Sequence, residues 1–566
     1  MLCGLLPPIL SWMFSSGIVK RAIAILVLVV TGAMAVWWPR PRLSNFSLDT
    51  PPELDAFFNR VASMPAVDPV FTLQGGRLLF SAREAGRYQI RSQEGILSGQ
   101  TARWDHFYPV LFGGHLVSLF DRDGDQKNEI EGETGCDLSR VKWPARLYSG
   151  LLVARAADPA SDEVYVIRPG DNRCLRGPFP LSGRYTGHAF SADGKLLAVT
   201  STLDLRLIDL TGAVARSLAE KLPGEKTGPV FDSRGALYFA GIGSSGFRDI
   251  FVLTPTADET PKLVDASPHD KSQLAISGSS LYFIEDVTTE YLLTRYDLVT
   301  HQLTRITREG VVYRYQLDGV RAIVSYADLN HPLSLYELNL ETARRAPLYP
   351  KNLPEIELEP ALSEQPPGLS QAWRFPVKGS PRGIVLSVHG GPDINVSPRW
   401  EPLFELWNRM GYEVIAPNYP GSRGFGEKFL EASLPESLVD LSGWLEWIQH
   451  AHPGLPIYLE GMSYGGILAQ YLWSRHPADF RGVMLRSSHL ARRPDEFNRS
   501  AAVLVELGRH DALVPYGESR RVLASWMKGS HTPIFFREYP HEGHVVRGSA
   551  SLVDSLRAVA TFMSRH

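Results

Sequence analysis

The chain has 566 residues, of which 44% are hydrophobic and 21% are charged, and its net charge is -3. A single hydrophobic core does not grow to this size, so we expect two or more domains. The small net charge gives no reason to expect a nucleic-acid partner.

The three cysteines, Cys3, Cys136 and Cys174, are too few for a disulfide framework. None of them has the CxxC spacing of a metal site. Cys136 and Cys174 can pair if the domain that carries them is exported; the alternative is two free, buried thiols.

An uncharged apolar run covers residues 22–38, directly after the basic pair 20–21. Signal peptides and short membrane anchors share this length. The small-x-small sequence at 33–35 fits a cleavage site, whereas the tryptophans at 37–38 resemble the interfacial end of a membrane helix. We therefore expect residues 1–42 to be a signal peptide or a membrane anchor. The rest of the protein is then exported, either anchored in the inner membrane and facing the periplasm or exterior, or secreted.

Short β-rich runs alternate with turns from about residue 69 to residue 350. The hairpin tips, such as Gly76, Gly114, Gly194 and Gly235, are about forty residues apart and number about seven. This is the period of a propeller blade, and a blade must stack on its neighbours to bury both faces. We predict a β-propeller of about seven blades over 69–350. A β-sandwich is the alternative, but it would not keep one period so long.

Alternating aspartates at 121, 123 and 125 suggest a calcium loop. The loop lacks the glycine at position six and the terminal glutamate of an EF-hand, and it falls where the second blade needs a turn. We interpret it as a solvated turn. We predict no metal site and no cofactor.

Strands and helices alternate after Pro350, behind a linker rich in proline. The expected strands are 383–388, 412–416, 455–460, 482–485, 502–507 and 533–537, and the expected helices are 402–410, 438–450, 467–473, 519–527 and 552–563. This alternation predicts an α/β domain over 351–566 with a mostly parallel, doubly wound sheet. Residues 43–68 are expected to be a linker or helix that packs on this domain. Chemistry in such a sheet gathers at the carboxyl ends of the strands.

A Gly-x-Ser-x-Gly sequence surrounds Ser463, between a predicted strand and a predicted helix. This arrangement is typical of a nucleophile elbow, in which the serine occupies a tight turn. Glycines at 461 and 465 remove side chains that would collide with the neighbouring strand and helix. A glycine-rich turn without chemistry is the alternative.

An elbow serine needs a base and an orienting carboxylate, and the chain order in this fold class is serine, acid, histidine. Asp511 and His544 each follow the end of a predicted strand, in that order. His541 and His510 are rival candidates that we interpret as surface loop residues. We interpret Glu542 as a solvated loop charge.

The oxyanion of the reaction requires two N–H donors. The first expected donor is the N–H of Tyr464, directly after the nucleophile. The second comes from the loop His389-Gly390-Gly391-Pro392, whose glycines let the backbone approach a substrate. We favour the N–H of Gly391 as this second donor, with the N–H of Gly390 as the alternative.

Five motifs together resemble the prolyl oligopeptidase family of serine peptidases, in the style of its acylaminoacyl-peptidase and dipeptidyl-peptidase-like branches. The motifs are His389-Gly390-Gly391-Pro392, Asn418-Tyr419-Pro420-Gly421-Ser422-Arg423-Gly424-Phe425-Gly426, Gly461-Met462-Ser463-Tyr464-Gly465-Gly466, Asp511-Ala512-Leu513-Val514-Pro515 and Glu542-Gly543-His544. The resemblance implies a β-propeller joined to an α/β-hydrolase domain. It also implies a triad of Ser463, Asp511 and His544 that acts on short peptides screened by the propeller. His389 stands where prolyl oligopeptidase itself carries a tyrosine hydroxyl for the oxyanion, so a backbone N–H must serve here.

Three features depart from the family pattern. The segment from Ser463 to Asp511 is short and lacks roughly a helical pair that usually lines the substrate pocket. Pro420 stands where an arginine is common, and no paired glutamates for a free N-terminus are evident. The sequence therefore predicts a serine peptidase without identifying its substrate-binding residues. The alternatives are an esterase of the same fold and an exported propeller binding protein with weak or no catalysis.

Overall fold

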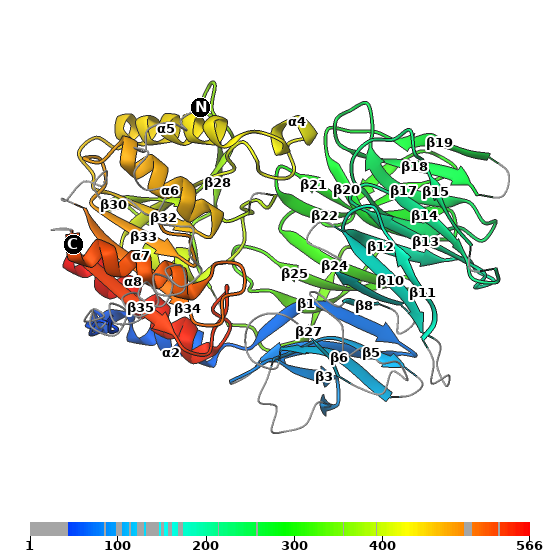
Figure 1. Cartoon of the computed structure of the whole chain (residues 1–566), viewed down its shortest axis with the longest axis horizontal. Helices are drawn as coiled ribbons and strands as arrows, with labels where there is room; N and C mark the ends of the chain where they lie inside the picture. Colours follow the sequence, from blue (N-terminus) through cyan, green and yellow to red (C-terminus); the bar gives the residue numbers. More distant parts are fainter. Residues whose placement is uncertain are drawn as a thin grey trace, which may run out of the picture. The chain divides into compact units, whose positions relative to one another are not determined.

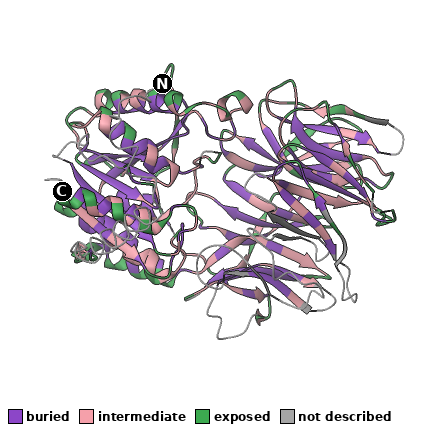
Figure 2. Ribbon diagram, viewed as in Figure 1, coloured by how far each residue is buried: buried purple, intermediate pink, exposed green. Residues whose placement is uncertain are grey.

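The computed structural model describes residues 43–566 apart from 84–85, 98–104, 113–114, 122–128, 132–145, 149–151, 157–160, 168–173, 213, 256–257, 355, 392, 492–500 and 530–532. Residues 45–566 form one compact unit. Its sheets are buried, while the covering helices expose their outer faces (Figure 2).

Seven antiparallel β-sheet units make up the N-terminal part (Figure 1). In chain order they are β1 (Ala66–Gln74), β2 (Arg77–Arg83), β3 (Gln89–Ser92) and β4 (Gly95–Ile96); β5 (Asp105–Phe112), β6 (His115–Asp121) and β7 (Glu129–Glu131); β8 (Arg146–Tyr148), β9 (Leu152–Ala156), β10 (Asp162–Ile167) and β11 (Cys174–Pro180); β12 (Tyr185–Phe190), β13 (Leu196–Ser201), β14 (Leu205–Asp209) and β15 (Val214–Leu218); β16 (Lys226–Phe231), β17 (Leu237–Ile242), β18 (Arg248–Thr254) and β19 (Asp258–Asp265); β20 (Asp270–Ser277), β21 (Ser280–Val287), β22 (Glu290–Asp297) and β23 (Leu303–Arg305); and β24 (Val311–Asp318), β25 (Arg321–Ala327), β26 (Ser334–Asn339) and β27 (Arg345–Tyr349). The predicted β-propeller of about seven blades is confirmed.

The first hairpin of six blades contains a β-bulge at the same place. The register shifts between Val67 and Phe71, Phe107 and Val110, Tyr185 and Gly187, Thr227 and Val230, Ser272 and Ala275, and Val312 and Arg314. A bulge bends a strand and re-aims its side chains. The bulged segments of five blades line one cavity, at which the first strands of neighbouring blades meet.

The last blade packs against the first. The side chain of Gln316 on β24 donates to the carbonyl of Leu73 on β1 at 2.7 Å and accepts from its N–H at 2.9 Å. Apolar residues of both blades form one cluster that includes Phe71, Phe80 and Leu335. The amide side chain thus replaces strand pairing where the ring closes.

The C-terminal part contains an eight-stranded sheet in the order β28-β29-β31-β30-β32-β33-β34-β35. Its strands are β28 (Leu362–Glu364), β29 (Ala372–Phe375), β30 (Gly383–Val388), β31 (Tyr412–Pro417), β32 (Ile457–Met462), β33 (Gly482–Arg486), β34 (Ala502–Gly508) and β35 (Ile534–Tyr539), and its helices are α3 (Pro402–Arg409), α4 (Glu427–Leu430), α5 (Leu434–Ala451), α6 (Tyr464–Arg475), α7 (Tyr516–Gly529) and α8 (Ser549–Arg565). The six strands β30 to β35 are parallel, whereas β28 and β29 pair antiparallel at one edge. The α/β-hydrolase architecture is confirmed, with α5 and α6 on one face of the sheet and α8 on the other (Figure 1).

The segment before the propeller packs on the α/β domain. It contains a short 3-10 helix, η1 (Pro52–Leu54), and α2 (Asp55–Ser63). Phe57 and Phe58 of α2 are buried in the same core cluster as Val559 of α8 and Trp407 of α3. The apolar face of α2 therefore packs against the α/β domain rather than against a blade.

Several predictions fall on residues that the structure leaves out. The apolar run 22–38, Cys136 and most of the aspartate loop lie outside the described residues, as does the side chain of Cys174. Within residues 43–566, as far as they are described, no helix is long and apolar enough to cross a membrane. The described part of the chain also contains no cluster of metal-ligating side chains. The anchor, the location and the state of the cysteines stay predictions.

Candidate active site

Ser463 lies on the turn between β32 and α6 with a strained backbone, at φ 54° and ψ -120°. A Cβ on Gly461 would lie 2.4 Å from the carbonyl oxygen of Gly465, and a Cβ on Gly465 would lie 2.1 Å from that of Val388. These distances are far below van der Waals contact, so the turn requires both glycines. The packing of β30 and α6 around the turn holds the strained serine.

His544 connects the serine to a carboxylate. Its Nε2 lies 2.9 Å from Ser463 Oγ, and its Nδ1 lies 2.9 Å from Asp511 Oδ2. The other carboxylate oxygen of Asp511 accepts the N–H groups of Leu513 and Val514 at 2.9 and 2.8 Å. Both His544 and Asp511 are 8% exposed. The structure thus brings together the three residues that the sequence predicts as a triad.

The loops that carry Asp511 and His544 approach each other because Gly508 has no side chain. A Cβ at this position would lie 2.0 Å from the carbonyl oxygen of Gly543. Gly508 is not among the residues that the sequence motifs single out. Its position could have indicated this role, because a glycine that ends a strand directly before a functional loop often allows a close approach of backbone.

The prediction for Glu542 is wrong. Its side chain is 3% exposed rather than solvated, and its carboxylate accepts the N–H groups of Arg547 and Gly548 ahead of α8. A buried carboxylate needs such partners. Glu542 therefore holds the loop that carries His544. Of the rival histidines, His541 is exposed and His510 is partly buried.

The predicted oxyanion donors lie around the elbow. Tyr464 is the first residue of α6, where an N–H has no partner inside the helix. A Cβ on Gly390 would lie 3.4 Å from Ser463 Cβ, so this glycine is next to the elbow serine. Gly391 has φ 119°, a conformation that favours glycine. The two glycines let the backbone turn beside Ser463.

His389 lies against the motif that contains Tyr419 and Ser422. Its ring stacks on Tyr419 at 4.3 Å, and its Nε2 lies 2.9 Å from Ser422 Oγ. Burial lowers the pKa of His389 to about 4. The hydroxyl of Tyr419 donates to the carbonyl of His389 at 2.8 Å. These contacts hold the loop that leads to Gly390 and Gly391.

A buried charged cluster lies beneath the elbow. Arg486 at the end of β33 lies 3.5 Å from Glu460 and 3.1 Å from Glu506, and Tyr539 donates to Glu506 at 2.5 Å. Burial is the main influence on Glu460 and raises the pKa of its carboxyl group. The sequence analysis missed this cluster, although charged residues inside apolar strands were a visible signal. It connects the four neighbouring strands β32, β33, β34 and β35, three of which lead to the loops of Ser463, Asp511 and His544.

Loops of the α/β domain contact the propeller through polar groups. Arg423 forms ion pairs with Asp393 and, at 2.8 Å, with Glu225 of the propeller. Tyr291 donates to Asn395 at 2.8 Å, close along the chain to Gly391. The propeller thus takes part in positioning the segment that follows Gly390 and Gly391.

Comparison with known proteins places these features in context. A family model for serine aminopeptidases (S33) matches residues 379–507. Dipeptidyl-peptidase 5 of Porphyromonas gingivalis is 24% identical over 335 residues, which cover 53% of this chain and 47% of that relative. A thermostable monoacylglycerol lipase of Bacillus sp. is 31% identical over 123 residues, which cover 22% of this chain and 47% of that relative. The chain thus spans less than half the length of these curated relatives.

Solved structures match over nearly the whole chain. A puromycin-hydrolyzing peptidase of Mycobacterium tuberculosis superposes with a TM-score of 0.72 at 17% identity, covering 92% of this chain and 97% of that one. A structure from a study of two prolyl endopeptidases superposes with a TM-score of 0.70 at 12% identity, covering 98% of this chain and 96% of that one. The chain therefore has the fold of the prolyl oligopeptidase family of serine peptidases, which confirms the resemblance seen in its sequence motifs.

Proposed function

We propose that this protein is a serine peptidase that hydrolyses short peptides through an acyl-enzyme. The observation that carries the proposal is the pair of 2.9 Å contacts that His544 makes with Ser463 and Asp511. A serine on a strained elbow, a histidine within reach of its hydroxyl and a buried carboxylate behind the histidine are the parts that nucleophilic catalysis needs.

In this mechanism Ser463 Oγ attacks the scissile carbonyl while His544 Nε2 takes its proton. Asp511 accepts the Nδ1–H of His544 and stabilises the imidazolium that forms. The N–H groups of Tyr464 and Gly391 bind the oxyanion, with Gly390 as the alternative second donor. His544 then protonates the leaving amine, and water hydrolyses the acyl-enzyme by the same steps in reverse order.

The propeller limits access to Ser463 in this proposal. Support comes from the polar contacts that tie it to the oxyanion loop and from the indole N–H of Trp373, which donates to Thr289 at 2.8 Å. A peptide then reaches the serine through the propeller cavity or between the two parts of the unit. Folded proteins are too large for either route.

Labelling with a fluorophosphonate probe tests the nucleophile. The wild-type protein should be labelled, and Ser463→Ala should not be labelled while its melting temperature stays close to that of the wild type. An unlabelled wild-type protein would favour the binding-protein alternative. Full labelling of Ser463→Ala would refute the assignment of the nucleophile.

An esterase of the same fold is the second candidate, favoured by the match to a monoacylglycerol lipase. Elbow, base and oxyanion donors serve both reactions. The two functions separate when kcat/KM is measured for peptide and ester substrates with the same acyl group. A protein that cleaves only the esters would be an esterase.

We also propose that the protein is exported, on the basis of the apolar run 22–38. The full-length chain should then remain in the membrane pellet after a carbonate wash, or leave the cell if the segment is cleaved. Recovery of uncleaved full-length protein from the cytoplasm would contradict this proposal.

A further inference from the structure

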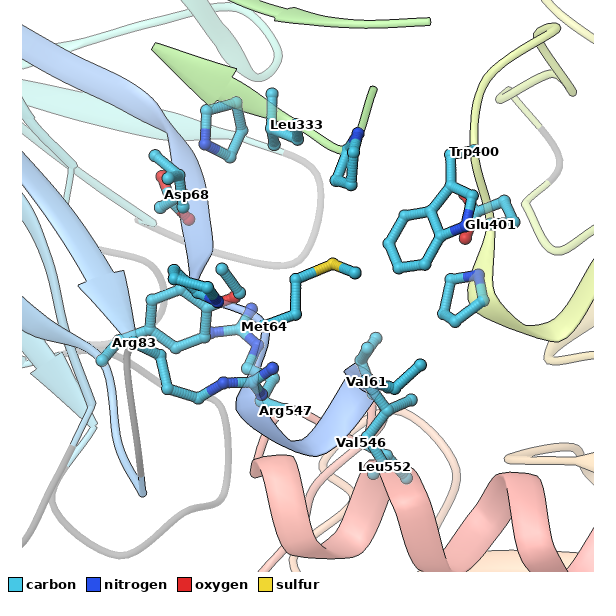
Figure 3. A pocket seen from close by; sticks show the side chains of 18 of the residues that line it. Val61, Met64, Asp68, Arg83, Leu333, Trp400, Glu401, Val546, Arg547 and Leu552 are labelled. Atoms are coloured by element: carbon cyan, nitrogen blue, oxygen red, sulfur yellow. The ribbon is translucent and has the colours of Figure 1, made fainter. Parts of the chain in front are cut away.

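A cavity of about 310 Å³ lies beside the loop of the catalytic histidine (Figure 3). One wall is Val545, Val546 and Arg547, the three residues that directly follow His544. Other parts of its lining come from β1 and β2 of the first blade and from the 399–402 segment. The cavity therefore borders both the propeller and the catalytic loop.

Two arginines in this cavity form no ion pair with any residue that the structure describes. Arg83 is 5% exposed, its Nε has no hydrogen-bond partner, and its guanidinium forms no ion pair with any described residue. The guanidinium of Arg547 likewise makes no ion pair within the described part of the chain, although its backbone N–H donates to Glu542. A buried cation without a partner is costly, and arginine is suited to bidentate binding of a carboxylate.

Aromatic rings hold both guanidinium groups. Arg83 lies 5.5 Å from the ring of Tyr88, and Arg547 lies 4.7 Å from the ring of Phe107. These two rings are in contact, with centroids 5.4 Å apart. In Figure 3 Arg83 and Arg547 lie on the same side of the cavity, with Trp400 and Glu401 across it. The stacking orients the two cations and leaves their N–H groups available.

The other charges of the cavity offset this pair only in part. Arg399 is paired with Glu401 and lies 5.6 Å from the ring of Tyr313. Asp68 accepts the N–H of Val70 at 2.9 Å, and burial raises the pKa of its carboxyl group against the opposing charges of Arg547 and Arg314. No described cation lies within ion-pair distance of Asp68. The cavity as a whole carries three cations and two carboxylates, which leaves an excess of one positive charge on the side of Arg83 and Arg547.

The position of the cavity indicates which part of a substrate reaches it. A catalytic histidine passes its proton to the leaving group, so the leaving group lies on the histidine side of the serine. Arg547 follows His544 by three residues, which span at most about 11 Å. A leaving group of roughly one to three residues can bridge this distance.

We propose that this cavity binds a carboxylate on the leaving-group side of the substrate, through Arg83 and Arg547. The inference rests on the proposed peptidase function and specifies its substrates. The carboxylate is the free C-terminus of a short peptide or an acidic side chain near that end. In the first case the enzyme releases short C-terminal fragments.

The test compares matched peptides that share a blocked N-terminal part and a short neutral leaving fragment. One ends in a free carboxylate, a second in a carboxamide, and a third in a carboxamide with a glutamate in the leaving fragment. We expect kcat/KM to be at least about 10-fold higher for the free acid than for the plain amide, since hydrogen bonds to a charged group contribute this much. A preference for the third peptide instead would identify the acidic side chain as the ligand. Equal values for all three would overturn the proposal.

Variants test the assignment to the two arginines. In Arg83→Gln/Arg547→Gln the ratio of kcat/KM for acid and amide should fall close to one. Arg91→Gln is a matched control, because Arg91 belongs to the same blade and stacks on Tyr349 outside this cavity. It should keep both the activity and the ratio of the wild type. A double variant that keeps the wild-type ratio would refute the assignment.

Two further measurements keep the outcomes distinct. If the double variant does not fold, Arg547→Gln alone is assayed, and the released fragment is tested as an inhibitor of the wild-type protein in its acid and amide forms. Stronger inhibition by the acid supports the subsite, and equal inhibition contradicts it. Hydrolysis of all peptides without preference refutes only the subsite, whereas no hydrolysis of any peptide refutes the proposed function.

Discussion

The α/β sheet and the propeller differ in how tightly the backbone is packed around their glycine turns. At the carboxyl ends of β30, β32 and β34 the backbone is so close-packed that Gly461, Gly465 and Gly508 have no room for a Cβ. The propeller hairpin tips are open, and a Cβ on Gly76 or Gly194 would meet nothing within 4 Å. The irregular backbone of the propeller lies instead in the bulged first strands of its blades.

In the proposed function, this difference separates the region in which the chemistry occurs from the region in which substrates are selected. The catalytic groups lie on turns that neighbouring backbone holds in one conformation, which favours a preorganised site. The bulged strands re-aim side chains into a cavity without fixing their identity. We therefore expect substitutions to act on rate in the first region and on substrate choice in the second.

The largest expected effect is in the catalytic loop. His544→Ala should lower kcat on the order of 10⁴-fold or more, because the members of a triad act as a unit. His541→Ala should change kcat by less than about threefold, since triad effects are confined to residues that act in the step and His541 is exposed. Steady-state kinetics on one peptide measures both. A reversal of the two effects would assign the base to His541.

The second prediction concerns selection by the propeller. A short peptide should be hydrolysed, while the same sequence in an exposed loop of a folded carrier should remain intact, because the carrier cannot reach Ser463. Mass spectrometry after equal incubation detects both products. A denatured, unfolded carrier is the control for the sequence context. Equal cleavage of the short peptide and the folded carrier would show that the propeller does not limit access.

The third prediction compares two glycines directly. Gly465→Ala should destabilise the protein by more than about 3 kcal/mol, because the nearest atoms are backbone oxygens that side-chain rotation cannot move. Gly76→Ala should cost about 1 kcal/mol, for its φ of +76° alone. Thermal melts of both variants measure the difference. Similar melting temperatures would show that the elbow is less tightly packed than its geometry indicates.

The smallest expected effect lies where the propeller meets the α/β domain. Burial and the nearby charge of Asp270 raise the pKa of Asp286 to about 8, against the opposing charges of Arg248 and Arg423. Between about pH 4 and pH 8 the folded protein keeps a proton that the unfolded chain releases, so stability is lost as the pH rises through this window. Asp286→Asn cannot ionise and should therefore be more stable than the wild type at pH 8.

Melting temperatures of the wild type and Asp286→Asn at pH 5 and pH 8 measure this effect. The variant should gain much less over the wild type at pH 5, near the lower end of this window, than at pH 8. The same difference at both pH values would mean that Asp286 does not titrate in this window.

Much of the architecture could be predicted from local patterns. The forty-residue period predicted the blades, and alternation of apolar strands with helices predicted the parallel sheet, because each element must bury the face that its own residues make apolar. Chain order and strand ends also identified Ser463, Asp511 and His544. The prediction for Glu542 was wrong because the sequence of a polar loop does not reveal that two backbone N–H groups donate to this carboxylate.

The sequence by itself determined the two domain types and the residues suited to the catalytic chemistry, since period, motif and chain order are local properties. Only the tertiary structure decided which backbone carbonyls exclude a Cβ at Gly508 and which strands share the cluster around Arg486. It also decided that Arg83 and Arg547, 464 positions apart, border one cavity. The physical reason is that a buried charge is defined by its neighbours in space, and these come from distant parts of the chain.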